Sequence, residues 1–154
     1  MKSIHKRMML MFAVSLICAA VTANLTQNSR SAIHRVEQYA PEVVSGIVYD
    51  DWLVETHGGF HGDGDTLIRF DVTDPSVFDD FCAPPFESTI EIPTENEMTV
   101  QNLVLFSTDA EIPDPETAYW MLDAHGPTSI PWANHSIGLY YPEEQTFYWY
   151  ESDT

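Results

Sequence analysis

The chain has 154 residues, enough for one domain with a single hydrophobic core, and it carries 24 acidic residues against six Lys and Arg. Only Arg30, Arg35 and Arg69 lie after the first 23 residues, whereas all the acidic residues do. This charge excludes nucleic acid as a partner, because phosphate binding requires Lys and Arg. It also repels anionic lipid, and it attracts cations and basic proteins.

The N-terminus carries an export signal. Basic residues within 1–7 precede an almost entirely apolar run, 8–23, and the small side chain of Ala23 stands just before a possible cut at Asn24. Regions in this order are typical of a signal peptide. The run is short for a membrane span of about 20 residues, which favours cleavage, but Leu25 extends it slightly and an uncleaved anchor stays open. Residues 1–23 are therefore a signal peptide or membrane anchor, and the protein is secreted or held at the membrane by this helix.

Residues 24–45 are interpreted as a tether. A short helix is expected over 31–39, ended by Pro41. The folded, acidic domain is expected to cover 46–154. The only cysteine of this part is Cys82, so a disulfide within the domain is excluded once residues 1–23 are removed, and Cys82 is expected to be a small buried side chain.

The first predicted elements of the domain form a hairpin. Residues 46–55 and 66–72 have β-like apolar patterns, and a glycine-rich loop separates them. Asp74 and Pro75 then favour the start of a short helix, with an N-cap carboxylate and a proline in the first turn. Short strands are expected over 86–92 and 118–122, while 100–106 is ambiguous between strand and helix.

The clearest element is the C-terminal hairpin, formed by 136–141 and 145–151 around a proline-containing turn. Alternation along its second strand places Phe147 and Trp149 on one face and Tyr148 and Tyr150 on the other. The order of elements indicates an α+β fold. We expect one small domain with an antiparallel sheet of roughly five strands and one or two short helices, preceded by the signal or anchor helix.

The glycine-rich loop is the strongest candidate site. It contains His57, His61 and Asp63, and Asp65 follows it. Imidazole suits zinc and carboxylates suit calcium, and two histidines with a carboxylate can activate a water molecule. In an extended strand His57 and His61 would lie about 13 Å apart, so a shared metal requires the loop to fold back.

A structural interpretation of the same loop is preferred. Its histidine and aspartate side chains would then cap backbone groups of a tight turn. The calcium-loop pattern is incomplete, because no third acidic residue and no glutamate occur at the required positions. No cofactor is therefore assigned, and zinc or calcium stays the alternative.

A second candidate is a strip of aromatic side chains on the last two strands. Tyr140, Tyr148 and Tyr150 would bind a partner if they formed a contiguous exposed patch, although aromatic hairpins more often serve sheet packing. The loop and the closing hairpin together resemble an uncharacterised family of small exported proteins of Gram-positive anaerobic bacteria, whose chains carry a similar THGGFHGDG loop and aromatic C-terminal hairpin. The resemblance covers 49–154 and implies export and a single domain. It implies no activity, ligand or catalytic residue.

Two functions follow as hypotheses. The first is a non-enzymatic extracytoplasmic module that binds a basic protein or a cell-envelope component, with membrane contact only through an uncleaved N-terminal helix. The alternative is a metal-binding protein or metal-dependent hydrolase centred on His57 and His61. The sequence favours the first, because it contains none of the common hydrolase or phosphate-binding motifs.

Overall fold

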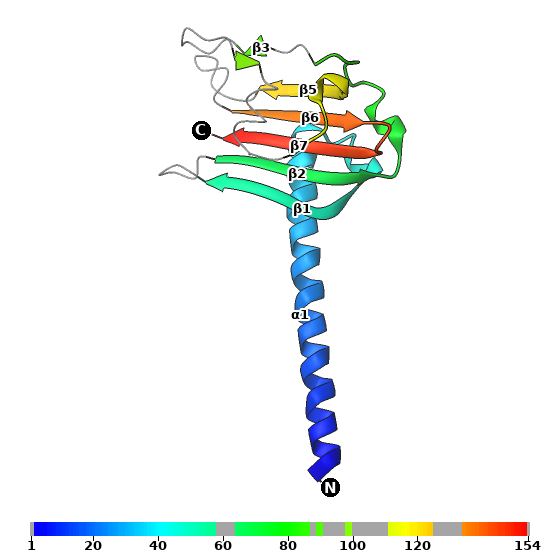
Figure 1. Cartoon of the computed structure of the whole chain (residues 1–154), viewed down its shortest axis with the longest axis vertical. Helices are drawn as coiled ribbons and strands as arrows, with labels where there is room; N and C mark the ends of the chain where they lie inside the picture. The colour runs from blue at the N-terminus through cyan, green and yellow to red at the C-terminus, as the bar shows by residue number, and fades with distance from the viewer. Residues whose placement is uncertain are drawn as a thin grey trace.

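The computed structural model describes residues 2–57, 64–86, 89–90, 98–99, 111–124 and 134–153. These residues form one long helix, a five-stranded antiparallel sheet and a separate pair of very short strands (Figure 1). The large sheet has the order β1-β2-β7-β6-β5. Its strands are β1 (Ile47–His57), β2 (Gly64–Val72), β5 (Tyr119–Ala124), β6 (His135–Tyr141) and β7 (Thr146–Asp153), and the small pair is β3 (Thr89–Ile90) and β4 (Met98–Thr99). The predicted α+β class with an antiparallel sheet is confirmed.

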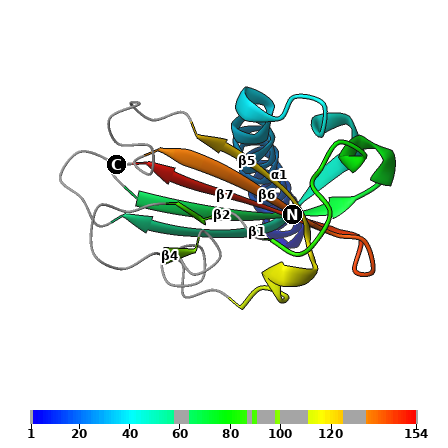
Figure 2. The same cartoon turned by 90° about the horizontal axis from the view of Figure 1, so that it is seen from above.

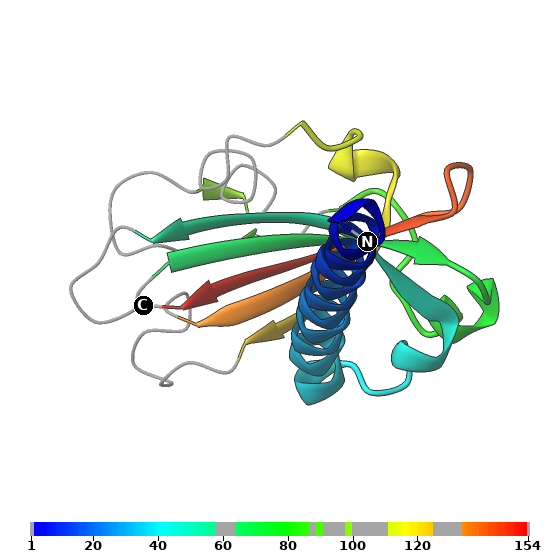
Figure 3. The same ribbon diagram turned by 90° about the horizontal axis from the view of Figure 1, so that it is seen from below.

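The helix α1 (Lys2–Tyr39) is continuous over 38 residues. It joins the expected signal or anchor to the helix predicted over 31–39, and it ends two residues before Pro41, which cannot continue a helix. Its N-terminal part extends well beyond the sheet, past β1, and its C-terminal end crosses one face of the sheet (Figures 1 and 3). One element therefore links the apolar N-terminus directly to the domain.

The last turns of α1 belong to the hydrophobic core. Ala32 and Val36 are buried against the sheet, and Ala40 and Val43 continue the same contact beyond the helix. Side chains four residues apart share a helix face, which is why this stripe lies against the strands. The ring of Tyr39 stacks on Trp149, with 6.4 Å between centroids. From Ala32 onward, the segment expected to be a tether is therefore packed as part of the domain.

Arg35 fixes α1 to the sheet by ion pairs. Its Nη1 donates to Glu151 Oε2 at 2.7 Å, and its Nη2 lies 3.4 Å from Glu55 Oε1. Glu151 Oε1 in turn accepts a hydrogen bond of 2.9 Å from the indole N–H of Trp149. One carboxylate therefore joins the helix to a side chain in the centre of the core.

Loss of this guanidinium should weaken the docking of α1. Arg35→Gln is expected to lower the free energy of unfolding by about 1–2 kcal/mol, because the pair lies between an exposed ion pair and a buried one. The measurement is the urea midpoint of the full chain in detergent. Arg30→Gln is the matched control, since Arg30 is exposed on the same helix. Equal midpoints for the two variants would contradict the role of Arg35.

The first predicted hairpin is confirmed as β1 and β2, which pair from Ile47 opposite Val72 to His57 opposite Gly64. A bulge interrupts β1 where Asp51 takes a φ of 66°. Asp50 turns back there, accepting a hydrogen bond from the backbone N–H of Trp52 and one from Arg69 Nε. The bond to Asp50 raises the pKa of Arg69. The bulge thus gives Arg69 a carboxylate partner on the neighbouring strand.

The predicted C-terminal hairpin is also confirmed. Strands β6 and β7 pair from Tyr141 opposite Thr146 to His135 opposite Ser152, and Gln145 closes the turn with a φ of 51°. The hairpin occupies the middle of the sheet, because β7 pairs with β2 on its other side. Both edges of the β6–β7 hairpin are therefore paired within the sheet.

Two apolar layers lie on opposite faces of the sheet. The layer beneath α1 is built on the following large side chains: Val36, Ile68, Phe70, Phe78, Phe147 and Trp149. The layer on the other face is built on Leu67, Phe86, Ile137, Leu139, Tyr148 and Tyr150. Figure 2 shows α1 on one side of the strands only. The predicted division of the β7 side chains between two faces is confirmed.

The helix predicted from Asp74 is a single turn, η2 (Pro75–Phe78). Its start is as predicted, because Asp74 accepts a hydrogen bond from the backbone N–H of Ser76, and bonds to Ser76 lower the pKa of this carboxyl. Beyond this turn, Cys82 pairs through its backbone with Trp120 of β5. Cys82 is exposed, so the expectation of a buried thiol is wrong.

Candidate functional site

The three tyrosines proposed as an aromatic strip are buried. Tyr140, Tyr148 and Tyr150 are 6%, 5% and 0% exposed. Tyr140 lies beneath α1, where its ring stacks on Phe78 at 4.1 Å, whereas Tyr148 and Tyr150 lie on the opposite face. The alternation of side chains was predicted correctly, but both faces are covered, and the three tyrosines form no exposed surface.

The glycine-rich loop falls largely outside the described residues. The side chains of His57, His61 and Asp63 lie there, so their separation is not part of the structure described. Asp65 is described, and its Oδ1 accepts a hydrogen bond of 2.6 Å from the Tyr150 hydroxyl. Within the described ranges, no three histidine, cysteine or acidic side chains come together as metal ligands. The metal hypothesis for this loop stays a prediction.

A row of polar side chains lies at the same end of the sheet as the loop. The strand register places Asp65 opposite Ser152, and Ser152 opposite His135. Neighbours of this kind share a face, and the rings of His135 and Tyr150 lie 5.6 Å apart. Only the register brings these residues together, so the sequence alone gave no signal for the row. Because His135 and Ser152 are buried, the row is part of the sheet and not an open site.

The opposite end of the sheet is acidic. There β1, β5 and β7 begin and β2 and β6 end, and Val72 N–H donates to Gln145 O at 2.9 Å. We call this the acidic end; its exposed carboxylates are Asp71, Asp74, Asp79, Asp80, Asp114, Glu116, Glu143 and Glu144. The β6–β7 turn and the segment after β2 both project from this end of the sheet (Figure 2).

The segments that form the acidic end contain no lysine or arginine to neutralise its carboxylates. No lysine or arginine follows Arg69 in the chain, and Arg69 and Arg35 are engaged by carboxylates elsewhere. The segments of the acidic end are tied together by short contacts, including a hydrogen bond of 2.9 Å from the Tyr141 hydroxyl to Pro113 O. Burial raises the pKa of Tyr141, so this phenol remains a neutral donor. The carboxylates are thus displayed on a fixed framework.

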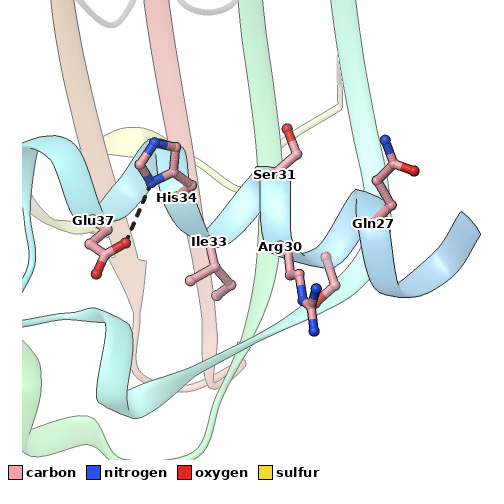
Figure 4. A pocket seen from close by; sticks show the side chains of 7 residues that line it. Gln27, Arg30, Ser31, Ile33, His34 and Glu37 are labelled. Atoms are coloured by element: carbon pink, nitrogen blue, oxygen red, sulfur yellow. Dashed lines mark hydrogen bonds and ion pairs between the residues drawn. The ribbon is translucent and has the colours of Figure 1, made fainter. Parts of the chain in front are cut away.

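The exposed stretch of α1 next to the sheet carries a shallow depression. It is lined by Gln27, Ser29, Arg30, Ser31, Ile33, His34 and Glu37 (Figure 4). Within the depression, His34 Nδ1 lies 3.4 Å from Glu37 Oε2. Arg30 lies in this depression as an exposed cation. The depression is open to solvent along the helix and encloses no site.

Among the described residues, one helix segment is long and apolar enough to cross a membrane. It begins at Met11, and its apolar window has no part buried in the domain. Length and composition suit a signal or a membrane anchor equally. Comparison with family models, curated proteins and solved structures finds no match to this chain.

Proposed function

We propose that the protein is a non-enzymatic binding module on the outer side of a membrane, held there by an uncleaved α1. The observation that carries the proposal is the continuity of α1. Its apolar part passes without a break into the turns that bury Ala32 and Val36 beneath the sheet. A helix that is both apolar at one end and docked at the other holds the domain at a fixed distance from the bilayer.

The acidic end is the proposed binding surface. Its carboxylates are exposed on several turns at one end of the sheet, and no Lys or Arg occurs from residue 70 onward. Such a surface attracts positively charged partners over a Debye length of about 8–10 Å at physiological salt and raises their rate of encounter. The partner class is a basic protein or a cationic component of the cell envelope. Nucleic acid is excluded by the same charge.

Membrane retention is tested by fractionation. The full chain, expressed with its own N-terminus in a bacterial host, is expected in the washed membrane fraction at its intact mass of 17.5 kDa. Recovery of a soluble species that begins near Asn24 would overturn the anchor. Because the domain faces outward in this proposal, protease added to intact spheroplasts should also degrade it.

Binding at the acidic end is tested with a lysine-rich peptide and the full chain in phosphatidylcholine nanodiscs. Glu143→Gln with Glu144→Gln is expected to weaken binding about three- to tenfold at low salt, since each exposed ion pair contributes about 0.2–1 kcal/mol. Salt near 1 M, where the Debye length is about 3 Å, should remove most of the difference.

The matched control removes two exposed carboxylates elsewhere, with Glu37→Gln and Asp51→Asn. It changes net charge equally, so it separates a local surface from a general effect of charge. Equal weakening by both pairs would show that the acidic end is not the binding surface.

A further inference from the structure

Strand β1 is the edge of the sheet that lies closest to the apolar part of α1. The sheet order ends at β1, and the N-terminal part of the helix emerges past this strand (Figure 1). A cleft of about 200 Å³ marks the crossing, and Asn28, Ser31 and Arg35 of α1 line it together with Tyr49 and Leu53 of β1. The contact fixes the height of β1 along the helix.

When the apolar run of α1 lies in a bilayer, β1 lies at the level of the membrane surface. The run ends at Ala23, five residues before Asn28, which corresponds to about 8 Å along a helix. A headgroup layer is about 5–8 Å thick on each side of the hydrocarbon core. Because the strands cross α1, a helix near the membrane normal places β1 flat along this layer, with β5 at the far edge (Figure 1).

The exposed side chains of β1 suit this position. Val48 is 52% exposed and Leu53 is 44% exposed; outside α1, the other exposed large apolar side chain in the described ranges is Tyr119, at 37%. Val48 and Leu53 lie on β1, which is the strand nearest the apolar run of α1, whereas Tyr119 lies on β5. The apolar exposure of the sheet is therefore concentrated at the edge that faces the apolar part of α1.

The charges near β1 are of both signs. Arg30 is exposed on α1, and Asp51 and Glu55 are exposed on β1. A zwitterionic headgroup offers a phosphate to the arginine and an ammonium group to the carboxylates. An anionic headgroup would instead face the net negative charge of the domain.

We propose that β1 rests on the membrane surface, with Val48 and Leu53 among zwitterionic phospholipid headgroups and Arg30 at their phosphates. The inference rests on the proposed retention of α1 and adds the lipid surface as a second partner of the domain. The bilayer then covers the unpaired edge of β1, which would otherwise be open to pairing with another strand.

The test uses fluorophores at single cysteines in the full chain, reconstituted into phosphatidylcholine vesicles that contain a lipid with a nitroxide headgroup. On a background of Cys18→Ala and Cys82→Ala, the label is placed by Val48→Cys, by Leu53→Cys or, as the matched control on the far edge, by Tyr119→Cys. Quenching at 48 and 53 is expected to exceed that at 119 about threefold or more, because the quencher is confined to a headgroup layer about 5–8 Å thick. Exchange of part of the lipid for phosphatidylglycerol should reduce it.

Flotation of the same vesicles separates this inference from the anchor itself. If the protein does not float with the vesicles, the retained anchor fails and the inference fails with it. If it floats while quenching is equal at the three positions, the anchor stands and the placement of β1 is overturned. Quenching that is unchanged or stronger with phosphatidylglycerol would overturn the assignment to zwitterionic lipid.

Discussion

Trp149→Ala is expected to lower the free energy of unfolding by about 3–5 kcal/mol, the usual cost of removing a large aromatic side chain from a core. Trp149 is fully buried beneath α1, its ring stacks on Tyr39, and its indole N–H bonds to Glu151. Domains of this size are stable by about 5–15 kcal/mol, so much of the population should unfold under mild denaturant. Circular dichroism of the full chain during urea titration provides the measurement.

Trp149→Phe is the control for this prediction. It keeps most of the ring packing and removes the hydrogen bond to Glu151, so its effect should be clearly smaller than that of the alanine variant. A Trp149→Ala protein with the urea midpoint of the wild type would contradict the docking of α1 on the sheet.

Gly46→Ala should be the most damaging small substitution in the described chain, at about 2–3 kcal/mol, because overpacking a tight site displaces backbone. A Cβ at this position would lie 2.6 Å from the backbone oxygen of Asp74 and within 2.8 Å of both Val77 methyl carbons. Gly46 O also accepts hydrogen bonds from the N–H groups of Thr73 and Asp74, which bring the segment after β2 against the start of β1.

The neighbouring Ser45 supplies the control, because it is exposed and Ser45→Ala adds no atoms. Thermal unfolding of the two variants in the same detergent should differ by several degrees, with only Gly46→Ala below the wild type. Coincident melting curves would show that the contact of Gly46 with the segment after β2 is loose.

Local patterns predicted the two hairpins because each one is determined by neighbouring residues. Alternating apolar side chains and a turn containing Pro142 were sufficient for β6 and β7. The same alternation separated Phe147 from Tyr148 correctly. What covers each face depends on residues distant in sequence, and for this reason the alternation alone does not decide whether the tyrosines are exposed. Phe86 and Ala118 reach that face from elsewhere in the chain.

The sequence contains a signal for the docking of α1. Ala32, Val36 and Ala40 recur at intervals of four, the spacing of one helix face, although small side chains make the pattern inconspicuous. The row formed by Asp65, Ser152 and His135 had no such signal, because it depends on the register of three strands. The acidic end likewise required the topology that brings the turns together.

The unbroken helix gives the domain a mechanical connection to its surroundings. With α1 in a bilayer, the apolar run 8–23 spans about 24 Å, less than a typical hydrocarbon thickness of about 30 Å. Such a mismatch is relieved by thinning the bilayer or drawing the flanking residues inward. Since α1 is docked on the sheet by Val36 and Arg35, the helix and the sheet move together as one unit. A change in membrane thickness or helix tilt would thereby become a change in the height and inclination of the whole domain.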